Sequence, residues 1–158
     1  VGLDAIKEKV EHSFEGFRVA SHYGCHMLKP AEILMSDDPE NPTVMDELVA
    51  ATGATPVEYP SKLECCAGPV MGVREAVTWS VGLDKVKEVK EHGDALVTAC
   101  PFCYLTFERC QLMQENNPEL PVMHIPQLLG LAMGLDPDEV GLTHNKVGAK
   151  AVAGRLEG

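Results

Sequence analysis

The chain has 158 residues, of which 45% are hydrophobic, 23% charged and 5% aromatic. This length is typical of one domain, and the composition can bury an aliphatic core and does not indicate disorder. Thirteen Lys and Arg against 24 Asp and Glu give a net charge of −11, which leaves no positive surplus to bind phosphates or anionic lipid. We therefore expect one globular domain over residues 1–158 that binds no nucleic acid.

The apolar runs of the chain are short. Residues 127–133 fall far short of the roughly 20 residues that a helix needs to cross a bilayer, so we expect no membrane span. The first residue is Val1 and no charged-then-apolar leader follows it, so we expect no signal peptide and a cytoplasmic location. A chain that begins with Val is also consistent with a piece of something longer.

The first half begins with apolar residues at intervals of three to four, which predict an amphipathic helix over residues 3–15. A strand is expected over residues 17–23, and it places Cys25 where that strand ends and a loop begins. The Pro- and Asp-containing segment 29–42 is expected to be irregular. A helix capped by its first residue is then expected over residues 43–52.

The middle of the chain repeats the pattern of a strand followed by a cysteine loop. Residues 55–59 are a short strand candidate, and they lead into the loop 64–69 with its two adjacent cysteines. A long helix is expected over residues 74–92, weakened at Gly82. Residues 94–99 are the clearest buried strand of the sequence, and Cys100 and Cys103 come directly after it.

The remaining elements continue this alternation. Pro101 suits the first position of a helix, after which a strand over 121–125, a helix over 126–135 and a weaker helix over 145–156 are expected. Alternating strands and helices predict a Rossmann-like α/β fold with a parallel sheet, in which ligands gather beyond the carboxyl ends of the strands. The sequence therefore predicts that the cysteine loops meet at one edge of the sheet.

Five of the six cysteines form the pattern C-x39-CC-x33-C-x2-C. They are Cys25, Cys65, Cys66, Cys100 and Cys103. Thiolates are the usual ligands of iron–sulfur clusters, and a fifth sulfur exceeds the four ligands of a tetrahedral zinc site, so the pattern favours a cluster with several irons. Structural zinc, a thioredoxin-like dithiol and disulfides are the alternatives. Cys110 lies outside the pattern and is expected to be a buried small hydrophobe without a role.

Other polar residues lie close in sequence to the cysteines. His22 and His26 flank Cys25, so either could donate a proton to a leaving thiolate or hydrogen-bond to cluster sulfur, and the alternative is a packing role. Three cations near the cysteine loops could attract an anionic substrate, but we expect each to be a solvated surface charge. They are Lys29, Lys62 and Arg74.

The order of one cysteine, a vicinal pair followed by Gly and Pro, and a final C-x-x-C resembles the cysteine-rich CCG domain found in the B subunit of heterodisulfide reductase and in its relatives. Residues 22–26, 28–30 and 127–137 extend the resemblance to a core of about residues 17–142. They look like the second, C-terminal one of the two such domains in that subunit. One departure is that Ala67 follows the vicinal pair, where the family usually has Gly.

The resemblance implies that the five cysteines hold a noncubane [4Fe-4S] cluster that reduces the CoM-S-S-CoB heterodisulfide to coenzyme M and coenzyme B in methanogenesis. It also implies electron-delivering partner subunits, cluster-bearing and flavin-bearing, and an N-terminal CCG domain if this chain is a fragment. Two alternatives stay open. One is a zinc-stapled interaction module, and the other is a cluster-carrying electron-transfer module of another oxidoreductase complex.

Overall fold

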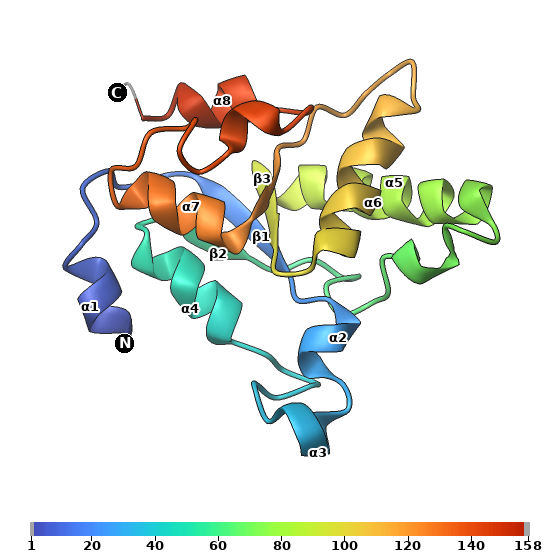
Figure 1. Ribbon diagram of the computed structural model, residues 1–158, viewed down its shortest axis with the longest axis horizontal. Helices are drawn as coiled ribbons and strands as arrows, with labels where there is room; N and C mark the ends of the chain where they lie inside the picture. The colour runs from blue at the N-terminus through green and yellow to red at the C-terminus, as the bar shows by residue number, and fades with distance from the viewer. Residues whose placement is uncertain (1, 157–158) are drawn as a thin grey trace.

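A four-stranded parallel sheet lies at the centre of the computed structural model, which describes residues 2–156 (Figure 1). Its strands are β1 (Arg18–His22), β2 (Thr55–Val57), β3 (Ala95–Thr98) and β4 (Val122–His124), in the order β2-β1-β3-β4. All three strand pairs are parallel. The α/β class and the parallel sheet predicted from the sequence are confirmed.

Helices precede, connect and follow the strands. They are α1 (Leu3–Lys7), α2 (Cys25–Leu28), α3 (Ala31–Leu34), α4 (Val44–Ala51), α5 (Glu75–His92), α6 (Pro101–Leu112), α7 (Ile125–Ala132) and α8 (Ala149–Ala153), with 3₁₀ turns η1 (Gly68–Val70) and η2 (Leu142–His144). Within residues 2–156, none of the helices combines the length and the apolarity that crossing a bilayer requires.

The helices form a layer on each face of the sheet (Figure 1). Helices α4 and α7 cover one face, and α5 and α6 cover the other. Successive residues of a strand point to opposite faces, so Val19 of β1 packs with the α4–α7 core, whereas Ala20 packs with the α5–α6 core. The chain thus buries both faces of a short sheet, and the central strand β3 is buried at every residue.

The strand order reverses direction between β1 and β3. From β1 the chain moves outward through α4 to β2, and then α5 carries it back across the other face to β3. In open parallel sheets such a switch point leaves a crevice beyond the carboxyl ends of the two strands. The ends of β1 and β3, at His22 and Thr98, are paired in register and mark this place.

The amino-terminal helix is much shorter than its apolar spacing predicts. It ends at Lys7, and the backbone N–H groups of Glu11 and His12 instead donate to the carbonyl of Ala132, at 2.8 and 3.0 Å. The expected terminal helix over 145–156 is likewise reduced to α8. The first prediction was wrong at its end because hydrogen bonds to a distant part of the chain replace the helical ones. The second was wrong at its start because Gly148, with a φ of +70°, interrupts helical backbone just before α8.

The segment 29–42 is less irregular than expected, since it contains α3. Thr43 precedes α4, but its side chain does not cap that helix. The carboxylate of Asp37 takes this role, accepting hydrogen bonds from the backbone N–H groups of Thr43 and Val44 at 2.9 and 2.8 Å. Helix α5 runs through Gly82 without a break. A Cβ at Gly82 would lie 2.9 Å from the Thr106 side chain of α6. Gly82 therefore permits close packing of two helices.

Candidate metal–thiolate site

The five patterned cysteines lie at three strand-to-helix junctions on the carboxyl edge of the sheet. Tyr23 and Gly24 follow β1, and Cys25 then begins α2, so it is the first residue of a short helix and not the loop residue expected from the sequence. Cys65 and Cys66 lie in the loop between β2 and η1. Cys100 follows β3 as the residue before α6, and Cys103 lies in the first turn of that helix. The topology thus brings sulfurs far apart in sequence to one edge.

The closest sulfurs are those of Cys66 and Cys103, whose Sγ atoms lie 3.2 Å apart. Both residues are buried, and neither forms a disulfide. A ring nitrogen of His22 joins these two sulfurs in a group whose ligand atoms all lie within 4.8 Å of one another. Ligands of one tetrahedral thiolate metal centre lie about 3.8 Å apart for metal–sulfur bonds of about 2.3 Å. The buried group therefore has the compactness that a metal centre requires.

The vicinal cysteines converge because the backbone turns sharply after them. The N–H of Ala67 donates to Cys65 Sγ at 3.3 Å, and the N–H of Gly68 donates to Cys66 Sγ at 3.4 Å. Ala67 has a φ of +58°, in the left-handed region that favours glycine. This turn points two backbone amides at two sulfurs, an arrangement that stabilises thiolates.

Replacing Ala67 by glycine is expected to stabilise the folded chain. A residue with a Cβ costs about 1–2 kcal/mol in the left-handed region, and glycine costs about 0.5–1 kcal/mol in lost chain entropy, so we expect a net gain of about 0.5–1 kcal/mol. Urea unfolding of Ala67→Gly and of the parent chain measures this difference. A decrease in stability would show that the turn does not carry the strain inferred from its φ.

The sulfurs influence one another's ionisation. The S–H of Cys103 donates to Cys66 Sγ, and this hydrogen bond lowers the pKa of Cys66 to about 4, although burial acts in the opposite direction. The same hydrogen bond and burial raise the pKa of Cys103. Burial, followed by the charges of Cys65 and Cys66, raises the pKa of Cys25.

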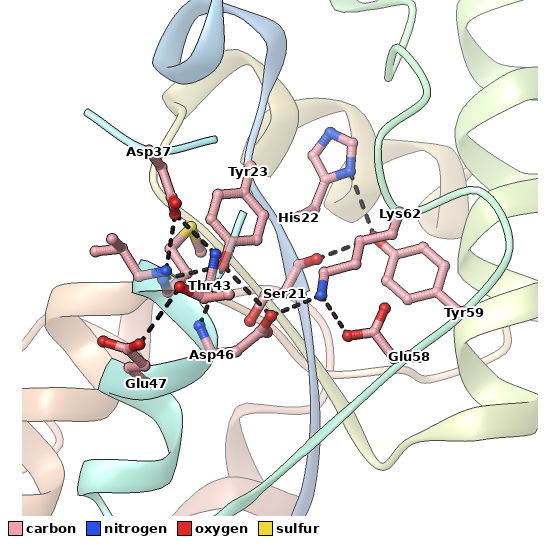
Figure 2. A network of polar contacts seen from close by, with 12 residues as sticks. Ser21, His22, Tyr23, Asp37, Thr43, Asp46, Glu47, Glu58, Tyr59 and Lys62 are labelled. Carbon is pink, nitrogen blue, oxygen red and sulfur yellow. Dashed lines mark hydrogen bonds and ion pairs between the residues drawn. The ribbon is translucent and has the colours of Figure 1, made fainter. Parts of the chain in front are cut away.

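His22 is the last residue of β1, and its ring is buried against the sulfur pair. Its Nδ1 lies 3.4 Å from the hydroxyl of Tyr59, an interaction that Figure 2 draws. Its Nε2 is buried and has no hydrogen-bond partner among residues 2–156. Burial lowers the pKa of His22, so the ring favours the neutral form. A buried ring nitrogen without a partner is costly, and a ligand at the cysteines would offer it one.

His26, the other histidine that flanks Cys25, lies elsewhere. It is the second residue of α2, is exposed, and its side chain makes no hydrogen bond within the described part of the chain. The fold therefore brings His22, and not His26, to the buried sulfurs. The proton-donor role considered for both histidines stays a prediction.

Gly24 lets the end of β1 approach the C-x-x-C turn. A Cβ at this position would lie 3.1 Å from the Cβ of Cys100 and 3.5 Å from Cys103 Sγ, and the φ of Gly24 is +76°. Neither condition suits a residue with a side chain. The conformation of this one glycine thus brings Cys25 and the C-x-x-C pair close to each other.

Replacing Gly24 by alanine is expected to lower the metal content of the purified chain several-fold, because the added methyl group would push α6 away from β1. Gly16 provides the control, since its φ is +74° but a Cβ there meets no atom within 4 Å. Gly16→Ala should lose stability from backbone strain alone and keep its metal. Equal metal loss in both variants, measured by elemental analysis, would contradict the contact argument.

The prediction that Lys62 is a solvated surface charge was wrong. Its side chain is buried, and its Nζ lies 2.6 Å from Asp46 and 2.6 Å from Glu58 (Figure 2). The hydroxyl of Tyr23 joins the same network by donating to Asp46 Oδ2 at 3.3 Å. Sequence spacing showed Glu58 four residues before Lys62, but it did not show Asp46, which lies on α4.

The donor set fits a metal–thiolate centre. Five cysteines follow strands at one edge of the sheet, two of their sulfurs nearly touch, and a ring nitrogen of His22 lies within 4.8 Å of both of these sulfurs. Thiolate and imidazole donors are those of iron–sulfur and zinc centres. Fold and site together define a cysteine-rich α/β domain of the metal–thiolate class.

Comparison with known proteins agrees with this class. The family model described as CCG, a cysteine-rich domain, matches residues 19–108. This chain belongs to the CCG domain family, and it is similar to the B subunit of heterodisulfide reductases.

Three relatives illustrate the similarity. The chain is 39% identical to the B subunit of ferredoxin:CoB-CoM heterodisulfide reductase from Methanosarcina mazei, over 92% of this chain and 51% of that protein. It is 41% identical to the B subunit of the ferredoxin/F(420)H(2)-dependent CoB-CoM heterodisulfide reductase from Methanosarcina acetivorans, over 82% and 46%. It is 31% identical to the 8-methylmenaquinol:fumarate reductase membrane anchor subunit of Wolinella succinogenes, over 93% and 54%. The chain thus spans about half the length of these relatives.

A solved structure supports the fold alone. The crystal structure of a hypothetical protein from Helicobacter pylori matches with a TM-score of 0.65 and 15% sequence identity, over 92% of this chain and 28% of that one. The low sequence identity carries no argument about chemistry. The structural match supports the arrangement of the strands and helices.

Proposed function

We propose that this chain holds a noncubane [4Fe-4S] cluster through Cys25, Cys65, Cys66, Cys100 and Cys103. The observation that carries the proposal is the gathering of these five cysteines at one sheet edge, with two buried sulfurs 3.2 Å apart. Four sulfurs would satisfy zinc, so the fifth favours a centre with several metal ions. The buried members face the protein core, while Cys25 and Cys65 are exposed. That exposure suits a centre which a substrate must reach.

We further propose that the cluster serves the reductive cleavage of the CoM-S-S-CoB heterodisulfide. The relatives named as B subunits of CoB-CoM heterodisulfide reductases support this substrate. The reaction consumes two electrons and two protons and yields the thiols of coenzyme M and coenzyme B. When bound, the cluster would supply electrons one at a time and iron that stabilises a leaving thiolate.

The chain's own residues have separate tasks in this proposal. The five cysteines hold the iron, and the amides of Ala67 and Gly68 stabilise negative charge on the vicinal sulfurs. The neutral ring of His22, one nitrogen of which lies within 4.8 Å of the Cys66 and Cys103 sulfurs, would hydrogen-bond to sulfur of the bound cluster. The substrate would approach the cluster from the edge at which Cys25 and Cys65 are exposed. In this scheme protons reach the product thiols from that edge.

The same proposal includes partners and a location. The named relatives are subunits of reductases, which supports partner subunits for this chain. In the proposal these partners carry clusters and flavin and deliver the electrons. Because the chain spans about half of these relatives, a second CCG domain would complete the substrate site. A cytoplasmic complex fits these assignments.

One experiment tests the proposal. The chain is purified without oxygen, its iron, zinc and acid-labile sulfide are measured, and EPR spectra are recorded before and after coenzyme M or coenzyme B is added. We expect about four irons and four sulfides per chain and a thiol-dependent spectrum. About one zinc and no sulfide would overturn the cluster assignment.

A second candidate is an electron-transfer module without its own disulfide substrate. The similarity to the fumarate reductase membrane anchor subunit from Wolinella succinogenes favours it, because that relative matches 93% of this chain at 31% identity. Iron and sulfide without any thiol-induced spectral change would support this candidate over the heterodisulfide substrate.

A further inference from the structure

Lys85 is a buried lysine next to the loop that carries the vicinal cysteines. It is 4% exposed, compared with 7% for Lys62. Lys62 is paired with two carboxylates at 2.6 Å, whereas no carboxylate oxygen within residues 2–156 lies within 4.0 Å of the Lys85 ammonium. Burying an ammonium group without a paired anion is costly. We therefore expect other negative charge near the buried ammonium of Lys85.

The ammonium of Lys85 holds the cysteine loop against α5. It projects from that helix and donates to the carbonyl of Ser61 and, at 3.2 Å, to the carbonyl of Glu64. Glu64 directly precedes Cys65, so Lys85 holds the backbone next to the first cysteine of the vicinal pair. The ammonium also lies 5.8 Å from the centre of the Tyr59 ring, whose hydroxyl contacts His22. Lys85 thus links α5 to the interior wall of the cysteine site.

The charges around Lys85 include the buried sulfurs. Burial lowers its pKa, and negative charge at Glu64, Glu88, Cys66 and Cys103 acts against that effect. Glu64 and Glu88 line a cavity of about 360 Å³ together with Lys85. The carboxylate of Glu88 is already engaged by the Ser61 backbone N–H at 3.1 Å. The buried sulfurs of Cys66 and Cys103 thus add to the negative charge that these two carboxylates place around the ammonium.

We propose that Lys85 is a positioning residue of the cysteine site, which fixes residues 61–64 against α5 and stabilises negative charge on the sulfurs of Cys66 and Cys103. This inference rests on the proposed function, since it concerns the centre that those sulfurs hold. A reduced cluster carries one more negative charge than an oxidised one. A fixed cation nearby favours the reduced state, so Lys85 raises the reduction potential.

The first test measures the reduction potential after anaerobic loading with iron and sulfide. Lys85→Gln keeps a hydrogen-bond donor and removes the charge, and Lys85→Arg keeps the charge. Lys87→Gln is the matched control, because it removes a charge from an exposed position of the same helix. At a fixed potential, EPR-monitored titration should show about a tenfold lower ratio of reduced to oxidised cluster for Lys85→Gln than for the parent chain. This change corresponds to a reduction potential lower by about 59 mV for one electron. Lys85→Arg should restore the ratio to within about twofold, and Lys87→Gln should not change it.

The second test needs no metal. Hydrogen–deuterium exchange of the unloaded chain should show at least about tenfold faster exchange of the amides of residues 61–67 in Lys85→Met than in the parent chain or in Lys87→Gln. If the parent chain takes up iron but Lys85→Gln has an unchanged potential, the charge role of Lys85 is wrong. If the parent chain takes up no iron, the proposed function fails. Unchanged exchange in Lys85→Met would overturn the positioning role in either case.

Discussion

Replacing Cys66 by alanine is expected to lower the iron content of the purified chain at least about tenfold. Cys66 lies at the centre of the buried group, since its Sγ is 3.2 Å from Cys103 Sγ and faces the His22 ring. Removing this sulfur leaves Cys103 without its hydrogen-bond acceptor and leaves a metal centre without a buried ligand. Loss of a ligand of this kind removes most of the affinity of a thiolate site.

Cys110 provides a matched control for this experiment. It is a buried cysteine of α6 that is fully enclosed, and its thiol donates to the carbonyl of Phe107 at 3.4 Å and not to another sulfur. Cys110→Ala should keep its iron and lose only the stability that a small cavity costs, about 1 kcal/mol. Equal iron loss in the two variants would show that the iron content follows folding and not ligation. Retention of iron by Cys66→Ala would remove Cys66 from the ligand set.

The sequence was sufficient to predict the sheet and the edge on which the cysteines gather. Alternating apolar strands and amphipathic helices specify a parallel sheet, and parallel strands place the segments that follow them on one edge. Cys25, Cys66 and Cys100 each follow a different strand, so their meeting could be expected without coordinates. The distance between the sulfurs of Cys66 and Cys103 could not, because it depends on the turn at Ala67 and on the approach allowed by Gly24.

The buried lysines show where sequence patterns were insufficient. Lys85 shares one face of α5 with Thr78, Gly82 and Val89, all of them buried, so helical periodicity could have placed it inside. Charged side chains are seldom fully buried, so periodicity alone does not identify Lys85 as a core residue. Lys62 carries no such periodicity. Its main partner, Asp46, lies on another element, and only the tertiary structure brings them together.

Replacing Lys62 by methionine is expected to destabilise the chain by about 2–3 kcal/mol. The Lys62 ammonium lies 2.6 Å from Asp46 Oδ2, and the Asp46 side chain is only 15% exposed. Asp46 Oδ1 has no hydrogen-bond partner within residues 2–156, so this carboxylate depends on few other groups. Removing one partner of a buried pair costs about 3–5 kcal/mol, and the partial exposure of this pair reduces that figure. Urea unfolding of the two proteins measures the difference.

A double-mutant cycle separates the ion pair from simple packing. Asp46→Asn removes the other charge, so the loss in Lys62→Met combined with Asp46→Asn should be smaller than the sum of the single losses by about 1–2 kcal/mol. Arg18→Met is a comparison for an exposed pair, because Arg18 and Asp94 lie 2.8 Å apart but half of the Arg18 side chain is exposed. It should cost less than Lys62→Met, since water and salt screen that pair. Additive losses in the cycle would mean that Lys62 stabilises the loop before Cys65 through the packing of its apolar stem and not through its charge.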